Sequence, residues 1–311
     1  MAVHAFPVIR DATLMLDAAL ARCTHDAMER RENIDMTGAL ALTAFAVVLG
    51  FNQVVIKVSN GGFQPVFMAG VRSALAVCVM LAWMRYKGVS PRLAREHIGA
   101  AVLLGLLFSA EFICLYLALD FTSVSRASII FYSMPVWLTL AAHFVLPNER
   151  ITPSRGLGLA LAMGGVIWVL ADPSGHDASL RGDFLALGAA LTWGGIALVL
   201  RLSKIGQQPP ELGLFWQLFL SAPLLLAISP FFGPLVRDVQ PIHLAGLAFQ
   251  VLAVASFGYL IWFVLLKIYP ASGVASFSFL SPVCGVLLGW LLLGEHIGVE
   301  IIGGLVLMNR R

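Results

Sequence analysis

Charged residues are scarce in this chain of 311 residues. Asp, Glu, Lys and Arg make up 12% of it, whereas 59% of the residues are hydrophobic and the mean hydropathy is +0.88. Soluble domains carry about 25% charged residues, and one soluble core of this size could not bury so much apolar surface. The composition therefore indicates a protein whose surrounding solvent is lipid.

Motifs for catalysis and for metal or nucleotide binding are missing as well. There is no Walker A loop, HExxH or GxSxG motif, which disfavours ATP hydrolysis by that route and a zinc protease. The cysteines form no CxxC pair, and we interpret them as small buried hydrophobic residues: Cys23, Cys78, Cys114 and Cys284. The net charge of +3 is small and the basic residues are spread over short loops, so no nucleic-acid partner is expected. We expect no enzyme, no cofactor and no metal site.

Long apolar runs are what the chain does have. A membrane helix needs about 20 mostly apolar residues, because each residue rises about 1.5 Å through a hydrocarbon core about 30 Å thick. Ten stretches meet this requirement, the last of them short: 36–58, 63–84, 98–119, 123–145, 153–171, 182–202, 211–231, 243–266, 271–293 and 296–309. The gaps carry helix breakers and none could hold a soluble domain. The predicted fold class is an all-α integral membrane protein with ten transmembrane helices.

Basic residues are distributed unevenly between alternate loops. With both termini inside, the inner side collects Arg30, Arg31, Arg85, Lys87, Arg92, Arg95, Arg150, Arg155, Arg201, Lys204, Lys267, Arg310 and Arg311. The outer side receives only Lys57, Arg126, Arg181 and Arg237. The positive-inside rule therefore predicts an N-in, C-in topology. Residues 1–35 lack an apolar h-region with a cleavage site, so we expect a cytoplasmic segment there, with an amphipathic surface helix as one form of it.

The second half of the chain repeats features of the first half in the same order. An offset of 144 to 147 residues relates Gly38 to Gly182, Gln64-Pro65 to Gln208-Pro209, Leu119 to Leu266, Ser125 to Ser272, Pro135 to Pro282 and Glu149 to Glu295. We predict a first five-helix repeat at 36–172 and a second at 182–311. Because five is odd, the second copy must enter the membrane in the opposite sense, which is the inverted architecture of alternating-access transporters.

These features resemble a known family of membrane proteins. The two five-helix copies, the run Ser125…Pro135…Glu149 with its echo Ser272…Pro282…Glu295, and the short last helix with a basic tail are similar to the drug/metabolite transporter superfamily, in its ten-helix EamA-type branch. The resemblance covers about residues 36–311, and the subgroup it suggests is that of the YddG-like aromatic amino-acid exporters. It implies efflux of aromatic and other neutral amino acids across the inner membrane of a bacterium, without ATP hydrolysis by the protein itself.

Charges inside the spans are few, and two of them lie at similar depth. Arg72 in the second span and Glu111 in the third both lie roughly 12–14 Å from the outer end of their helix. Because charges within a membrane are costly unless paired, we expect an ion pair between them. One interpretation is a structural pair that fixes the first half. The other is that Glu111 takes up protons as a coupling ion, or faces the cavity.

Two prolines and a set of polar and aromatic residues complete the candidate site. Pro135 and Pro282 are expected to bend the fourth and ninth spans and to act as gating kinks. The candidates for a substrate cavity are Asn52, Gln53, Glu111, Tyr132, Ser133, Trp193, Gln250, Tyr259, Trp262 and Ser278. Neutral hydrogen-bonding groups interleaved with rings suit a neutral or zwitterionic, partly apolar solute. Serine as packing glue and Trp or Tyr as interface anchors remain the alternatives.

The function favoured by the sequence is a secondary transporter that exports small metabolites by alternating access around a central cavity. Its partners would be a small-molecule substrate and the lipid bilayer, and no oligomeric state is predicted. Transporters of organic cations or of nucleotide-sugar-like solutes with the same fold, and a passive channel, are the alternatives. Phosphate-bearing solutes would require several cationic groups in the cavity, and Arg72 is the only cation that lies deep within a span.

Overall fold

The computed structural model describes residues 34–145, 151–171, 179–269, 277 and 279–309, so most of the predicted segment 1–35 lies outside it. Within these residues the chain is helical, apart from an isolated bridge between Phe63 and Val236. The helices in chain order are α2 (Met36–Asn60), α3 (Pro65–Lys87), η1 (Arg95–His97), α4 (Ile98–Phe121), α5 (Val124–Phe131), α6 (Met134–Val145), α7 (Pro153–Ala171), α8 (Leu180–Leu202), η2 (Lys204–Gln207), α9 (Pro210–Ile228), η3 (Ser229–Phe232), α10 (Pro241–Phe249), η4 (Gln250–Ser256), α11 (Phe257–Ile268), α13 (Leu280–Leu293) and α14 (Val299–Asn309).

The all-helical membrane architecture expected from the sequence is confirmed. In the described part of the chain, seven helices or continuous helix pairs are long and apolar enough to cross a membrane, and three shorter apolar helices accompany them. Each predicted stretch contains helix, and the edges agree to within a few residues except where the ninth stretch begins, outside the described residues. Backbone hydrogen bonds satisfied within each helix make such segments compatible with lipid.

The fourth and eighth segments are not uniform helices. The fourth is divided at Tyr132 and Ser133 into α5 and α6, and the eighth contains the π-helical segment η4 between α10 and α11. Pro135 and Pro282 lie in the first turns of α6 and α13. At the start of a helix, proline sacrifices no intrahelical hydrogen bond. Pro135 therefore begins the second piece of a divided span, with the break just before it, rather than lying inside one continuous helix. Its role as a gating kink stays a prediction.

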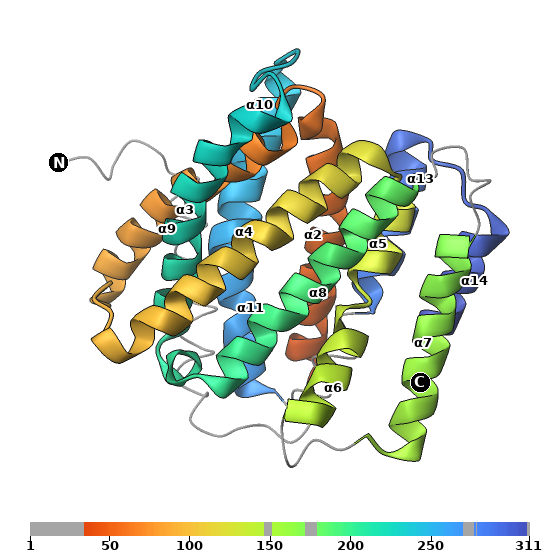
Figure 1. Ribbon diagram of the computed structural model, residues 1–311, viewed down its shortest axis with the longest axis horizontal. Coiled ribbons are helices and arrows are strands. Elements are labelled where there is room, and N and C mark those ends of the chain that lie inside the picture. Colours follow the sequence, from red (N-terminus) through yellow and green to blue (C-terminus); the bar gives the residue numbers. More distant parts are fainter. Residues whose placement is uncertain (1–33, 146–150, 172–178, 270–276, 278, 310–311) are drawn as a thin grey trace.

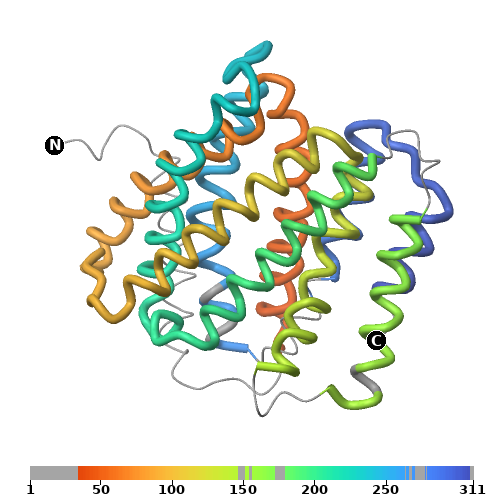
Figure 2. The backbone as a smooth tube through the Cα atoms, in the orientation of Figure 1, coloured from red at the N-terminus to blue at the C-terminus, as the bar shows by residue number. Residues whose placement is uncertain are grey.

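The helices form one bundle in which distant segments lie side by side. Figure 1 and Figure 2 show α7 and α14 standing together at one edge, although α7 lies near the middle of the chain and α14 near its end. The principal pairs are α4 with α8, α2 with α10, η4 and α11, α2 with α13, α8 with α5 and α6, α4 with α9, α3 with η4, α3 with α9, α5 with α13, and α7 with α14. The predicted stretches can be numbered one to ten in chain order, and each can then be replaced by the stretch five places along. The same set of pairs results: the pair of α4 with α8, for example, becomes the pair of α10, η4 and α11 with α2.

The beginnings of the two halves are built alike. Asp35 accepts a hydrogen bond from the Gly38 N–H at 2.7 Å, and Ser179 accepts one from the Gly182 N–H at 3.3 Å. A Cβ atom at Gly38 would overlap the ring of Tyr269, and one at Gly182 would lie 2.8 Å from the Cβ of Thr122. Asp35 and Ser179 thus cap the first helix of each half, and both glycines admit a close neighbour from the other half.

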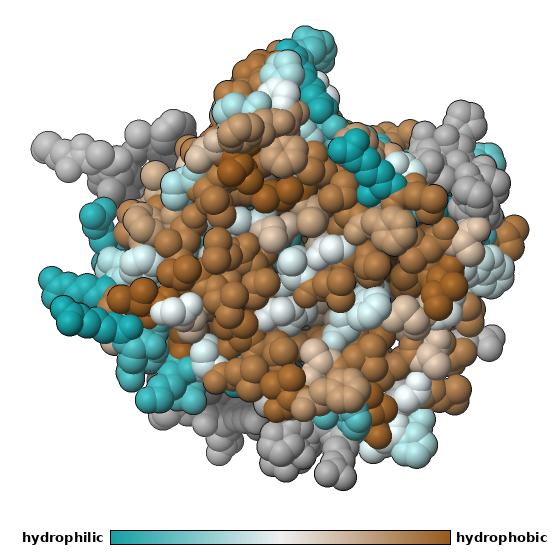
Figure 3. Space-filling view, viewed as in Figure 1, coloured by the Kyte–Doolittle hydropathy of each residue, from teal (hydrophilic) through white to brown (hydrophobic). Residues whose placement is uncertain are grey.

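The outside of the bundle is apolar. Figure 3 shows a face dominated by hydrophobic residues, with hydrophilic ones towards its rim. Large apolar side chains that are well exposed include Leu157, Ile167, Phe184, Leu287 and Leu291. A continuous apolar surface of this kind is what contact with acyl chains requires.

Helices α2 and α13 approach closely at Gly50, and this contact provides a test of the packing. A Cβ at Gly50 would lie 2.6 Å from the Cβ of Cys284 and 2.8 Å from the Gly285 nitrogen. We expect Gly50→Ala to lower the melting temperature of the detergent-solubilised protein, because overpacking costs about 1–3 kcal/mol. Gly164→Ala, where nothing lies within 4 Å of the added atom, is the matched control and should not lower it. Equal melting temperatures for both variants would contradict this packing.

Candidate functional site

A cavity of about 480 Å³ lies between the two halves of the bundle. Its wall runs from the middle of α4, near Phe108 and Leu115, to the segment between Leu200 and Pro210, where α8 passes through η2 into α9. We call this second limit the open end. We call the opposite limit, formed by residues 57–64, 119–126, 229–240 and 294–298, the closed end. No cavity-lining residue comes from the closed end.

Aromatic rings from both halves form the middle of the cavity wall. Phe131 stacks on Trp193 with ring centroids 4.9 Å apart, and Phe45 stacks on Trp262 at 5.1 Å. Tyr132 contacts Trp193 edge-on at 6.0 Å. Stacked and edge-to-face pairs of this kind are favourable beyond the area that they bury. They place flat apolar surface on two sides of the cavity.

Neutral polar groups lie among these rings. Asn52 and Gln53 on α2 line the cavity, together with Gln217 on α9 and Ser281 on α13. The Oδ1 atom of Asn52 and the Oε1 atom of Gln53 are buried and have no hydrogen-bond partner within the described residues. A buried acceptor without a partner is costly, so both atoms are suited to bind a donor on a solute.

Seven of the predicted cavity residues line the same cavity: Asn52, Gln53, Glu111, Tyr132, Trp193, Tyr259 and Trp262. Pro135 lines it too, whereas Pro282 is buried in α13. Ser133 lies away from the wall, donating to the Ile130 carbonyl at 2.6 Å and accepting from Trp137 Nε1 at 3.0 Å. Ser278 lies outside the described residues.

The expected ion pair between Arg72 and Glu111 is not formed. All three guanidinium nitrogens of Arg72 lack a hydrogen-bond partner within the described part of the chain. Its Cζ atom instead lies 3.8 Å from the centroid of the Phe112 ring, with Phe108 and Tyr116 at 6.0 and 5.8 Å. Cation–π contacts of this kind, stronger where water is excluded, take the place of the carboxylate.

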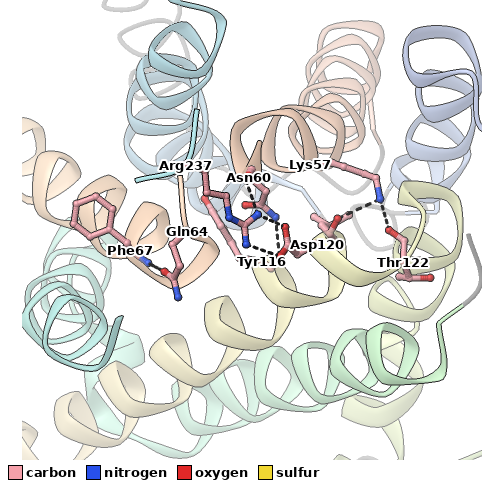
Figure 4. Close-up of polar contacts among 9 residues, drawn as sticks. Lys57, Asn60, Gln64, Phe67, Tyr116, Asp120, Thr122 and Arg237 are labelled. Carbon is pink, nitrogen blue, oxygen red and sulfur yellow. Dashed lines mark hydrogen bonds and ion pairs between the residues drawn. The ribbon is translucent and has the colours of Figure 1, made fainter. Parts of the chain in front are cut away.

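The closed end is held by cations that bind acceptors on neighbouring segments (Figure 4). Arg237 donates from Nη1 and Nη2 to the two carboxylate oxygens of Asp120 at 2.8 and 2.9 Å, and from Nη1 to the Asn60 carbonyl at 2.8 Å. The hydrogen bond to Asp120 raises the pKa of Arg237 further above its ordinary value. Lys57 donates to the carbonyls of Thr122 and Leu119 at 2.6 and 3.3 Å, at the C-terminus of α4, where positive charge is favoured.

A second ion pair at this end is fully buried. Arg126 donates from Nη2 to Asp183 Oδ2 at 2.6 Å and from Nε to both carboxylate oxygens at 3.2 Å, with side-chain exposures of 3% and 0%. Thr122 Oγ1 donates to Asp183 Oδ1 at 3.1 Å. The pair joins α5 to α8, so it connects the two halves.

Glu295 connects the halves at the N-terminus of α5. Its carboxylate accepts from the N–H groups of Val124 and Ser125 at 2.6 and 2.9 Å, and from Ser125 Oγ at 2.7 Å. Gly294, with a φ of 67°, ends α13 in the left-handed region that favours glycine. A carboxylate at a helix N-terminus satisfies free N–H groups and the positive end of the helix dipole.

Gln250 lies on the side of the bundle towards the closed end and does not line the cavity. Tyr116 Oη donates to Gln250 Oε1, and Gln250 Nε2 donates to Ser59 Oγ at 3.3 Å. Asn60 Nδ2 donates to the Tyr116 carbonyl at 2.9 Å. This chain of hydrogen bonds joins α2, α4 and η4. It also lies where η4 widens the helix, a distortion that often marks a functional position.

Sequence reasoning missed the closed end as a site. It identified Lys57, Arg126, Arg181 and Arg237 only as outer-loop charges, yet each of them has a partner, Arg181 through the Phe121 ring at 4.4 Å. The Asp183 partner was missed because a buried pair 57 residues apart leaves no local spacing signal. A signal for Glu295 did exist, since Ser125 and Glu295 both belong to the repeated run.

Comparison with known proteins gives a consistent result. The model of the EamA-like transporter family matches residues 36–171 and again residues 180–309. The chain is 28% identical to the "Probable amino-acid metabolite efflux pump" of Escherichia coli (strain K12), covering 88% of this chain and 92% of that protein. It is 25% identical to the "Uncharacterized transporter YoaV" of Bacillus subtilis (strain 168), covering 86% and 93%. A solved structure, described only as a crystal structure of a protein, shares the fold at a TM-score of 0.63 and 20% identity, covering 88% of this chain and 93% of that one.

The buried pair at the closed end makes a prediction about stability. Arg126→Leu should destabilise the protein by about 3–5 kcal/mol, because it leaves the Asp183 charge buried without a partner. The double variant Arg126→Leu, Asp183→Leu should recover most of this loss. Thermal unfolding in detergent measures both. The exposed pair of Lys204 and Glu96, with side chains 73% and 60% exposed, is the control: Lys204→Leu should cost less than about 1 kcal/mol. A double variant no more stable than Arg126→Leu would be evidence against the pairing.

Proposed function

Because the chain belongs to the EamA-like transporter family, we propose that it is a ten-helix secondary transporter that exports small metabolites, with aromatic and other neutral amino acids as its principal substrates. The name of the Escherichia coli relative, "Probable amino-acid metabolite efflux pump", supports this direction and class of cargo. The bacterial origin of the relatives supports a place in the cytoplasmic membrane of a bacterium.

The observation that carries the proposal is the cavity itself. Its volume of about 480 Å³ lies in the range of about 300–1,000 Å³ that is usual for small-molecule sites. The stacked pairs of Phe131 with Trp193 and of Phe45 with Trp262 offer surface for an aromatic side chain. Asn52 and Gln53 offer neutral hydrogen-bonding groups beside them. A partly apolar solute with a small polar head matches this combination.

The packing of the helices supports two inverted repeats. The principal helix pairs are preserved when each segment is exchanged with the one five places along. The family model likewise matches two successive segments of the chain. Two copies of an odd number of spans must run in opposite senses through the membrane, and transporters of this architecture bind their substrates between the copies.

The difference between the two ends supports alternating access. In this conformation Arg237, Arg126 and Glu295 connect the halves at the closed end, while the cavity extends to the open end near Arg201 and Pro209. Under the N-in topology the open end faces the cytoplasm, which is the side from which an exporter loads. A rocking of the halves that separates the closed-end contacts would release the solute outside. A passive channel would not need such a closed end.

Transport by purified protein in liposomes tests the proposal. Labelled phenylalanine or tryptophan should show saturable, protein-dependent counterflow. Trp193→Ala should lower it at least several-fold, because that ring stacks on Phe131 in the cavity wall. Trp290→Ala, which removes a ring that is 51% exposed on the outside of α13, is the matched control and should leave the rate unchanged. Flux no greater than in empty liposomes, for aromatic and other neutral amino acids alike, would exclude this substrate class.

A further inference from the structure

We propose that Glu111 recognises a protonated amine, so that the cavity also takes aromatic amines and other aromatic organic cations that carry no carboxylate. The inference rests on the proposed function, because it concerns the same cavity. It goes further by assigning the solute's charged group to one residue.

The carboxylate of Glu111 has no partner of its own. The residue lines the cavity and is only 3% exposed, and no hydrogen bond or ion pair joins it to another residue in the part of the chain that the structure describes. Arg72 acts on it electrostatically without a direct bond. A carboxylate within a membrane is costly unless a cation or a donor approaches it. A cationic group on the solute supplies that partner.

Arg72 is not available to the solute. Its side chain is fully buried, and its guanidinium lies against the face of Phe112 at 3.8 Å, with Phe108 beside it. Phe108 and Phe112 themselves line the cavity, whereas Arg72 does not. The rings therefore separate this cation from the cavity. The ionisable group that the middle of the cavity presents to a charged solute is the carboxyl group of Glu111.

The rings around Glu111 favour the same class of ligand. Phe112 follows it in the chain, and Phe108 lies about one turn away on α4. Tyr132 and Tyr259 lie within electrostatic range of the carboxylate, and both line the cavity. Ammonium groups are attracted to ring faces, more strongly when water is excluded. A carboxylate flanked by aromatic faces is thus suited to an ammonium or quaternary ammonium head.

A carboxylate group on the solute would find fewer binding partners in the cavity than an ammonium group. Among the described residues, the one cation in the cavity wall is Arg201, at the open end, and it already has an interaction of its own. In the middle of the cavity a solute carboxylate meets the neutral amides of Asn52 and Gln53. Recognition should therefore depend on the amine much more than on the carboxylate of an amino acid.

Four probes separate these contributions: L-phenylalanine, phenethylamine, benzyltrimethylammonium and 3-phenylpropionate. Binding is measured by calorimetry on the full chain in lipid nanodiscs. The two cations should bind within about tenfold of phenylalanine or more tightly, and 3-phenylpropionate at least tenfold more weakly than phenethylamine. Glu111→Gln should weaken phenethylamine binding at least tenfold, whereas Glu96→Gln, at an exposed ion pair, should not change it.

Phenylpropionate binding as tightly as phenethylamine, no binding of either cation, or unchanged phenethylamine binding in a folded Glu111→Gln protein would each overturn the inference. If that variant does not fold, the probe series on the native chain decides alone. Counterflow with the same probes keeps the two proposals apart. Transport of phenylalanine with no preference for the amine would overturn the inference and leave the transporter. Selective binding of the cations without transport of any probe would leave the ammonium site and exclude the exporter.

Discussion

The ion pairs and hydrogen bonds that join the two halves at one end of the bundle are the interactions on which the rest of the structure depends. Arg237, Arg126 and Glu295 each connect one half to the other. Bidentate arginine–carboxylate pairs are strong and directional, and a buried pair cannot lose one partner without leaving a charge in an apolar interior. Because the halves meet there, the space between them can open only towards the other end, and the cavity is one-sided.

The open end is held much less firmly, and this asymmetry is what a transport cycle needs. Its contacts include the exposed pair of Glu96 with Lys204 and a hydrogen bond from Trp216 Nε1 to the Pro91 carbonyl at 3.1 Å. Exposed contacts of this kind contribute little. If the halves rock as proposed, the buried contacts of the closed end separate, so a bound solute must offset the cost of separating them. The unpartnered Glu111 carboxylate is where the solute can contribute most.

The positions of the helices could be predicted well from the sequence, but the directions in which their side chains point could not. Runs of about 20 apolar residues and the breakers between them identify spans, because lipid admits few other structures. Pro135 marked the fourth span for a bend, and the span is divided just before it, at Tyr132 and Ser133. The π-helical segment at Gln250 was not predicted, because no glycine, proline or other local signal in residues 250–256 marks it. Arg72 and Glu111 lie near enough to interact electrostatically, but a position along a helix does not determine which way a side chain points. Phe112 lies over the guanidinium that was expected to meet Glu111.

The sidedness of the cavity is the most direct test of the transport mechanism. In a variant without native cysteines, Ala197→Cys places a thiol in the cavity wall, and Lys204→Cys and Asp238→Cys mark the open and closed ends. The measurement is the labelling rate of each thiol by a membrane-impermeant reagent added to one face of oriented vesicles. We predict that the thiol at 197 reacts from the same face as the thiol at 204 and not from the face that labels 238. Equal labelling at 197 from both faces, or labelling only from the face that reaches 238, would contradict a cavity closed at the end held by Arg237, Arg126 and Glu295.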